Sequence, residues 1–221
     1  MYLKTEIVSL PSELKSGKEF PVMETFYSIQ GEGFHAGTPA FFIRLGGCGV
    51  GCHWCDVKES WNAEDHPVQT IDKIIFEAKA SKAKTVIITG GEPLMYDLTG
   101  LTKTLRKENF KVHLETSGAY PLTGEWDWIC LSPKKFKEPL PGIVSEADEL
   151  KVIVYNKADF HFAECSAVAL FAALQGVVRP NLYLQPEWSR REVMLPLMVE
   201  YVKQNPEWRI SLQTHKYIGI R

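Results

Sequence analysis

Long hydrophobic runs, signal-peptide features and a charge excess are all missing from this 221-residue sequence. No apolar stretch approaches the length of a membrane-spanning helix, and the first residues, Met1 to Glu6, lack the apolar core of a signal peptide. The chain has 25 Lys and Arg against 27 Asp and Glu, and this net charge of −2 argues against binding nucleic acid through the overall field. We therefore expect a cytoplasmic protein whose partners include neither a membrane nor nucleic acid.

Cysteine is also scarce, and the five cysteines are not spread as a disulfide framework requires, because three of them are clustered. The composition is otherwise ordinary, with 45% hydrophobic and 24% charged residues, and the length suits one substantial core. We predict an N-terminal extension over residues 1–22 and a single domain over residues 23–221.

The clustered cysteines, Cys48, Cys52 and Cys55, have the spacing C-x3-C-x2-C in a glycine-rich loop that follows an apolar run over residues 40–45. Thiolates favour iron–sulfur clusters or zinc, and most clusters are held by four cysteines. A set of three thiolates therefore leaves one coordination position open, as a reaction site requires. Trp54 fits a wall that shields such a centre from water.

Two other interpretations of these cysteines stay open at this point. A structural zinc could use the three thiolates with His53 or His66 as the fourth ligand, since Cys3His sites are well known. Alternatively the thiols are unrelated buried residues, although a free cysteine prefers an apolar strand or helix to a glycine-rich loop. Cys130 and Cys165 lie in apolar stretches, and we expect both to be small core residues.

Apolar strand-like runs alternate with helical periodicity after residue 38. We predict strands at 39–45, 85–89, 111–115, 128–131, 150–154, 182–184 and 210–212, and helices at 70–78 with Thr70 as the N-cap, at 98–107, within 158–174 and at 191–204. This alternation predicts an α/β fold with a mostly parallel sheet. About six parallel strands in a chain of this length are too few for eight β/α units, so we expect a partial, open β/α barrel.

Polar motifs follow five of the predicted strands. They are Gly90-Gly91-Glu92-Pro93, Glu115-Thr116-Ser117-Gly118, Ser132-Pro133-Lys134, Gln185-Pro186-Glu187 and Gln213-Thr214-His215-Lys216. Ligands in such folds bind beyond the carboxyl ends of the strands. Any one of these motifs alone would be interpreted as a turn, but their recurrence indicates one shared binding mouth.

Two features nearer the N-terminus add polar groups. Gln30-Gly31-Glu32-Gly33 offers groups able to read the edge of a heterocycle, or is simply a surface turn. Arg44 ends an apolar strand, where a charge needs an anionic partner, either a structural carboxylate or a carboxylate of the substrate.

The cysteine spacing and its aromatic residue resemble the C-x3-C-x-aromatic-C motif of the radical S-adenosylmethionine (SAM) superfamily, and Gly90-Gly91-Glu92-Pro93 resembles that superfamily's GGEP motif. Together with the motifs around Gln30, Arg44 and the strand ends, residues 24–221 closely resemble the 7-carboxy-7-deazaguanine synthase (QueE) family of queuosine biosynthesis. The resemblance implies a [4Fe-4S] cluster held by Cys48, Cys52 and Cys55, with SAM on the fourth iron.

The family resemblance implies a carbon–nitrogen lyase that contracts the ring of 6-carboxy-5,6,7,8-tetrahydropterin to 7-carboxy-7-deazaguanine and releases ammonia. No side chain is expected to act as a nucleophile, because the cluster and SAM carry the chemistry. The resemblance also implies a homodimer and an electron donor such as flavodoxin or ferredoxin. The implied SAM contacts are Trp54, Cys55, Asp56, Gly90, Gly91, Glu92, Gly118, Ser132, Pro133, Lys134, Gln185, Pro186 and Glu187, and the implied substrate contacts are Ile29, Gln30, Gly31, Arg44, Thr116 and Arg221.

Two positions depart from the family pattern. The family usually has a Thr or Ser that helps to bind Mg²⁺ where this chain has Val57, and valine offers no oxygen to a hard cation. We therefore expect weaker stimulation by Mg²⁺, with Asp56, Ser60, a backbone carbonyl, water or Lys58 as substitutes. The family also commonly ends in proline with its carboxylate facing the substrate, whereas this chain ends in Arg221, whose side chain would have to turn away.

Other functions are considered beside this one. Another radical SAM enzyme, such as an activase that places a radical on a partner protein, would leave the Gln30–Gly33 motif without a role. A zinc-stabilised binding module would have no catalysis at all. His215 and Lys216 either close a pterin pocket or merely hydrogen-bond a neighbouring loop.

Overall fold

The computed structural model describes residues 17–175 and 180–221, so most of the predicted N-terminal extension lies outside the described residues. Nine strands of this described part form one sheet in the order β3-β1-β2-β4-β5-β6-β7-β8-β9. Seven of them run parallel: β2 (Pro39–Leu45), β4 (Thr85–Gly90), β5 (Lys111–Thr116), β6 (Trp128–Leu131), β7 (Glu149–Val154), β8 (Asn181–Pro186) and β9 (Trp208–Ile210).

The sheet has two free edges and does not close. β1 (Glu19–Ile29) pairs antiparallel with β2 and with the short edge strand β3 (Val68–Thr70), and β9 forms the opposite edge. The predicted α/β fold with a partial, open barrel is thereby confirmed, with seven parallel strands instead of about six. The turn after β1 brings residues 30–38 to the amino-terminal ends of the parallel strands.

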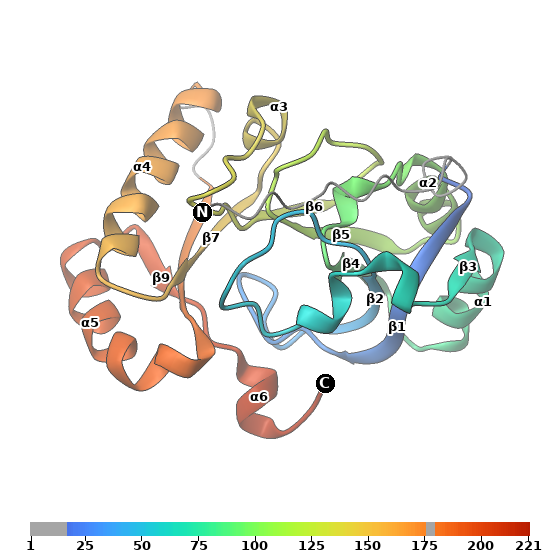
Figure 1. Cartoon of the computed structure of the whole chain (residues 1–221), viewed down its shortest axis with the longest axis horizontal. Coiled ribbons are helices and arrows are strands. Elements are labelled where there is room, and N and C mark those ends of the chain that lie inside the picture. Colours follow the sequence, from blue (N-terminus) through green and yellow to red (C-terminus); the bar gives the residue numbers. More distant parts are fainter. Residues whose placement is uncertain (1–16, 176–179) are drawn as a thin grey trace, which may run out of the picture.

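Helices cover the outside of the curved sheet. In Figure 1, α4 (Ala158–Ala173) and α5 (Arg191–Gln204) lie at the left of the view, and α1 (Ile71–Ala80) and α2 (Thr99–Lys107) lie at the right. The Thr70 hydroxyl accepts a hydrogen bond from the Lys73 amide at 3.3 Å, which confirms the predicted N-cap of α1. Two short helices, α3 (Pro141–Val144) and α6 (Thr214–Ile218), were not predicted. Among the described residues, no helix has the length and apolar character to cross a membrane.

Alternation along the strands separates an apolar outer face from a polar inner face. On β7, Leu150, Val152 and Val154 are buried in the main core. Glu149 and Lys151 are also buried but point to the opposite face, because successive side chains of a strand alternate. Burial of the apolar face beneath the helices therefore fixes which charged groups face the inside of the barrel.

Three details differ from the sequence-based expectations or extend them. The last strand begins at Trp208, which is 1% exposed and anchors the pairing with β8, and not at residue 210. Cys165 is exposed and is not a core residue, because the buried face of α4 carries Ala163, Ala167 and Leu170. β1 runs across the predicted boundary between residues 22 and 23, and the division there stays a prediction.

Candidate active site

A cavity of about 420 Å³ lies inside the open barrel, lined by the cysteine loop, by residues near the carboxyl ends of the parallel strands and by Gln30, Gly31 and Glu32, whose loop comes from the amino-terminal ends of the strands. The strand residues that line it come from five of the parallel strands, β2, β4, β5, β7 and β8, and further lining residues come from the segment after β9. Of the predicted site residues, those that line the cavity are Ile29, Gln30, Gly31, Arg44, Cys48, Cys52, Trp54, Cys55, Asp56, Gly90, Gly91, Glu92, Thr116, Ser132, Lys134, Gln185, Pro186, Glu187 and Arg221.

Two predicted SAM contacts, Gly118 and Pro133, are buried behind the cavity wall and do not line it. Gly118 has a left-handed φ of 77°, and a Cβ there would lie 2.6 Å from Leu131 Cδ1. Gly118 thus allows the wall to pack, and its contact with SAM stays a prediction.

The cysteine loop is held by backbone hydrogen bonds to the segment that follows it. Gly47 donates to the Ser60 carbonyl at 2.7 Å and Cys48 to the Trp61 carbonyl at 3.0 Å. Within the loop, the Cys55 amide donates to the Cys52 carbonyl at 2.9 Å. These bonds bend the chain so that Cys48, Cys52 and Cys55 all line one cavity.

The Gly90–Glu92 turn packs directly on the cysteine loop, and only glycine fits there. The Gly91 amide donates to the Leu45 carbonyl at 2.8 Å and the Glu92 amide to the Gly47 carbonyl at 2.9 Å. A Cβ on Gly91 would lie 2.1 Å from the Gly47 carbonyl oxygen. The two loops therefore form a single unit, and a side chain at Gly91 would separate them.

Glu92 ties this unit to the end of β5. Its buried carboxylate accepts hydrogen bonds from the Thr116 hydroxyl at 2.5 Å, from the Ser117 hydroxyl at 2.5 Å and from the Ser117 amide at 2.8 Å. The Leu94 amide donates to it as well, at 3.2 Å. Glu92 thus aligns two strand-end loops, and its predicted contact with the SAM ammonium stays a prediction.

Burial makes the thiols of Cys48 and Cys52 weaker acids. It raises the pKa of Cys48, and it raises the pKa of Cys52 to about 11 even though nearby Lys134 acts to lower it. A metal centre has to displace these protons before the sulfurs can bind it. The positive charge of a cluster would then compensate the buried thiolates.

The donor set fits a cluster held by three cysteines, because Cys48, Cys52 and Cys55 line one cavity. Over residues 17–175 and 180–221, no group of three or more His, Cys, Asp or Glu side chains is arranged to hold a metal ion. His66, an alternative zinc ligand, is instead bonded through Nε2 to the Glu59 carbonyl at 2.8 Å. Three thiols beside a cavity match a cluster with one open iron.

Comparison with known proteins agrees with this geometry. The radical SAM superfamily model matches residues 42–131, which span the cysteine loop and the Gly90–Glu92 turn. The 7-carboxy-7-deazaguanine synthase of Flavobacterium psychrophilum is 57% identical over 94% of this chain and 95% of its own length. The enzyme of the same name from Synechocystis is 50% identical, over 91% of this chain and 94% of its own.

The chain belongs to the 7-carboxy-7-deazaguanine synthase family. The crystal structure of QueE from Escherichia coli is similar to it, with a TM-score of 0.78, 29% identity and coverage of 93% of this chain and 98% of that one. Membership of this family brings with it a [4Fe-4S] cluster and SAM, and the cysteine loop described above supplies three thiols for such a cluster.

Arg44 has a structural carboxylate as a partner, and its predicted contact with the substrate stays a prediction. Its Nε lies 2.9 Å from Glu24 Oε1, and Arg221 Nη1 lies 3.1 Å from Glu24 Oε2. The main-chain oxygen of Arg221 accepts from the Ser28 hydroxyl at 2.6 Å. The terminal side chain therefore turns towards Glu24, and two guanidinium groups share one carboxylate at the cavity wall.

The C-terminal segment closes another wall of the cavity. Thr214 donates from its amide and its hydroxyl to the Gly31 carbonyl, at 2.9 and 3.0 Å, and a Cβ on Gly31 would lie 2.1 Å from His215 Nδ1. Lys216 Nζ lies 2.5 Å from Asp56 Oδ2. His215 and Lys216 thus line the cavity and also contact neighbouring loops, and a role in closing a pterin pocket stays a prediction.

The side chains beside Val57 do not fit a divalent cation. Val57 lines the cavity without an oxygen, and Asp56 Oδ2 already accepts from Lys216 and, at 3.2 Å, from Gln213. Ser60 is buried with its hydroxyl donating to the Val57 carbonyl at 2.7 Å, and neither Ser60 nor Lys58 lines the cavity. Positive charge beside Asp56 comes from Lys216 in this structure.

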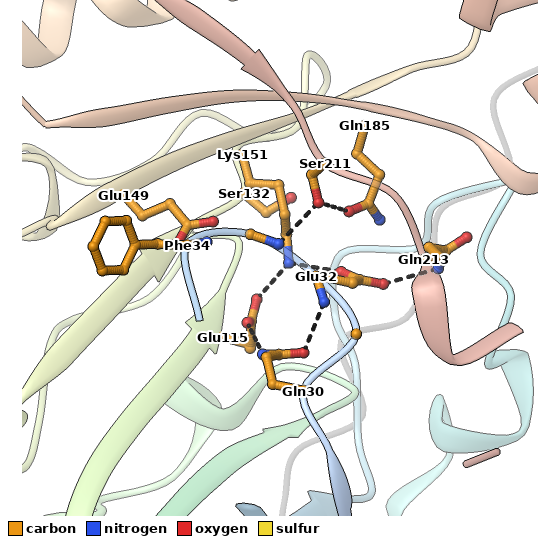
Figure 2. Close-up of polar contacts among 12 residues, drawn as sticks. Gln30, Glu32, Phe34, Glu115, Ser132, Glu149, Lys151, Gln185, Ser211 and Gln213 are labelled. Atoms are coloured by element: carbon orange, nitrogen blue, oxygen red, sulfur yellow. Dashed lines mark hydrogen bonds and ion pairs between the residues drawn. The ribbon is translucent and has the colours of Figure 1, made fainter. Parts of the chain in front are cut away.

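Sequence reasoning missed two charged residues of the cavity, Glu24 and Lys151. Lys151 Nζ lies 2.7 Å from Glu32 Oε2 and 2.8 Å from Glu115 Oε2, as Figure 2 shows. The signal in the sequence was the charge itself: a lysine within the buried run of β7 needs anionic partners. The sequence could not say which carboxylates they are.

Proposed function

We propose that the protein catalyses the ring contraction of 6-carboxy-5,6,7,8-tetrahydropterin to 7-carboxy-7-deazaguanine with release of ammonia. One observation carries the proposal: a single cavity is bounded by the three-cysteine loop and also by Gln30, Arg44 and Thr116. A reducing centre and a polar pocket for a small heterocycle are thereby brought face to face. The relatives that bear the name 7-carboxy-7-deazaguanine synthase support this assignment over 90% or more of the chain.

When bound at Cys48, Cys52 and Cys55, the cluster together with SAM would supply the radical chemistry for hydrogen abstraction from the pterin. The protein's contribution is to bind, orient and exclude water. Trp54 lines the cavity beside Cys55, and the Lys134 ammonium lies 5.6 Å from the centroid of its ring. Lys134 also donates to the Ser132 carbonyl at 2.5 Å and hydroxyl at 2.7 Å, which fixes this wall. No side chain has to act as a nucleophile.

Charge complementarity orients the substrate in this proposal. Arg44 lines the cavity and contacts Glu24 through Nε, and we propose that its other two guanidinium nitrogens donate to the substrate carboxylate. We further propose that the reaction does not depend strictly on Mg²⁺, because Val57 has no side-chain oxygen and Asp56 Oδ2 already accepts from Gln213 and Lys216. A homodimer and an electron donor such as flavodoxin or ferredoxin are proposals that follow from the family resemblance.

The test is an anaerobic assay of the reduced holoenzyme with SAM and carboxytetrahydropterin, with the product identified by mass. We expect 7-carboxy-7-deazaguanine in wild type and none in Cys52→Ser, which also loses bound iron. Cys165→Ser is the matched control, since Cys165 is exposed on α4, and it should retain both iron and activity. Formation of 5′-deoxyadenosine by wild-type enzyme without any carboxydeazaguanine would overturn the proposal.

A further inference from the structure

Lys151 is a buried cation between two carboxylates that come from distant parts of the chain. Its side chain is 5% exposed, against 18% for Glu32 and 20% for Glu115. Figure 2 shows it reaching from β7 to the Gln30–Gly33 loop and to the end of β5. All three residues line the cavity, so this charge group forms part of its wall.

The remaining oxygens of the two carboxylates are held by amide side chains. Gln30 Nε2 donates to Glu115 Oε1 at 3.1 Å, and Gln213 Nε2 donates to Glu32 Oε1 at 2.9 Å. Each carboxylate oxygen has two lone pairs, so neither carboxylate is saturated by these contacts. Hydrogen-bond acceptors are therefore fixed in direction at this wall.

The surroundings of Glu32 and Lys151 favour the charged form of both side chains. Burial acts to raise the pKa of Glu32, but the charge of Lys151 and hydrogen bonds from Lys151 and Gln213 outweigh it and lower that pKa to about 2. Burial acts to lower the pKa of Lys151, and the acidic groups around it, Cys130, Glu115, Glu32 and Glu149, raise it well above its ordinary value. At neutral pH one ammonium thus faces two carboxylates, which leaves a net negative charge.

Charged groups are consequently distributed unevenly around the cavity. One wall carries the Glu32 and Glu115 carboxylates, and another carries the Arg44 and Arg221 guanidinium groups on Glu24. A carboxypterin has the matching asymmetry, with a carboxylate at one end and the N3–H and 2-amino donors of its pyrimidinone ring at the other.

We propose that Lys151 is a positioning residue for substrate recognition, which holds the Glu32 and Glu115 carboxylates ionised and aimed at the hydrogen-bond donor edge of the pterin. This inference rests on the proposed function and names how its substrate is recognised. Without the ammonium, two carboxylates that lay within 2.8 Å of the same nitrogen would repel each other. The pair would then share a proton near neutral pH and lose an acceptor.

The test is the affinity of the SAM-loaded, anaerobically reconstituted holoenzyme for 6-carboxypterin, a stable oxidised analogue, measured by equilibrium dialysis. Lys151→Met should weaken this binding by about 10- to 100-fold, the value of one or two hydrogen bonds to charged groups. Its affinity should rise with pH between about 5.5 and about 7.5 as the shared proton leaves. Wild-type affinity should change much less, because Glu32 stays ionised and burial keeps His215 below its ordinary pKa. Glu149, whose pKa of about 7 falls within this interval, is excluded as the cause by measuring the same profile in Glu149→Gln and in Lys151→Met/Glu149→Gln.

Three variants separate positioning from a general loss of structure. Glu149→Gln alters a buried carboxylate two residues away on β7 that does not line the cavity, and it should bind the pterin as wild type does. Lys151→Arg should restore a flat pH profile. Glu115→Gln removes one carboxylate but leaves Lys151 paired with Glu32, so it should fold and still lose pterin affinity if Lys151→Met is unstable. SAM binding should be unchanged in all of them.

The outcomes are distinct. A Lys151→Met or Glu115→Gln protein that binds 6-carboxypterin with the wild-type affinity and pH profile would overturn the inference and leave the proposed function intact. A wild-type holoenzyme that binds SAM but no carboxypterin would instead remove the proposed function, and this inference with it.

Discussion

Glu149 is a buried acid whose charge state should control stability. It is 2% exposed at the start of β7, where Oε2 accepts from the Phe34 amide at 3.1 Å and from Trp128 Nε1 at 3.2 Å. Oε1 is buried without a hydrogen-bond partner. Burial, aided by the nearby Glu115 charge, raises its pKa from 4.5 to about 7, against the opposing effect of Lys151. We predict that Glu149→Gln, which keeps the acceptor and removes the charge, makes stability less dependent on pH.

The sign and size follow from linkage. A folded state that binds a proton more tightly than the unfolded state is stabilised below the unfolded pKa and loses that stabilisation as pH rises through the folded pKa. The rise from 4.5 to about 7 corresponds to about 3 kcal/mol at most, of which about 2 kcal/mol is lost between pH 5.5 and pH 8. Between these two pH values the change in the free energy of unfolding should therefore differ by about 2 kcal/mol between the two proteins, with wild type losing more than the variant.

The measurement is urea unfolding of wild type and Glu149→Gln at about pH 5.5 and about pH 8, followed by tryptophan fluorescence. His113, whose pKa burial lowers to about 4, contributes its own pH dependence to both proteins, so it cancels in the comparison. If the two proteins show the same change in the free energy of unfolding between these pH values, the reasoning about Glu149 is refuted.

Two predictions concern the loops around the cysteines. Gly91→Ala should bind severalfold less iron on reconstitution, because the added Cβ would meet the Gly47 carbonyl. The control is Gly142→Ala, which should bind as much iron as wild type because nothing lies within 4 Å of its added Cβ. A full iron complement in Gly91→Ala would contradict this prediction. Val57→Thr should increase the stimulation of product formation by Mg²⁺ several-fold, because it restores a hydroxyl beside Asp56. Strict dependence of the wild-type enzyme on Mg²⁺ after chelation, with a metal beside the substrate, would refute that expectation.

Local patterns in the sequence were sufficient for the secondary structure and for the cysteine loop. Thr70 caps α1 as its hydroxyl predicted, and α5 has the predicted bounds at residues 191–204. Such features depend on neighbours within a few residues, which the sequence displays directly. The last strand was misplaced by two residues because Trp208, an isolated core anchor, gave no alternating run to reveal it.

The sequence by itself determined that three thiols at C-x3-C-x2-C spacing share one loop, and that polar motifs recur where parallel strands end. Only the tertiary structure decided which charges meet: Lys151 with Glu32, 119 residues away, and with Glu115, 36 residues away. It alone placed Glu24 between Arg44 and Arg221, and Lys216 on Asp56. These contacts depend on strand register and on the curvature of the open barrel, which arise from packing of the whole sheet and leave no trace in a local pattern.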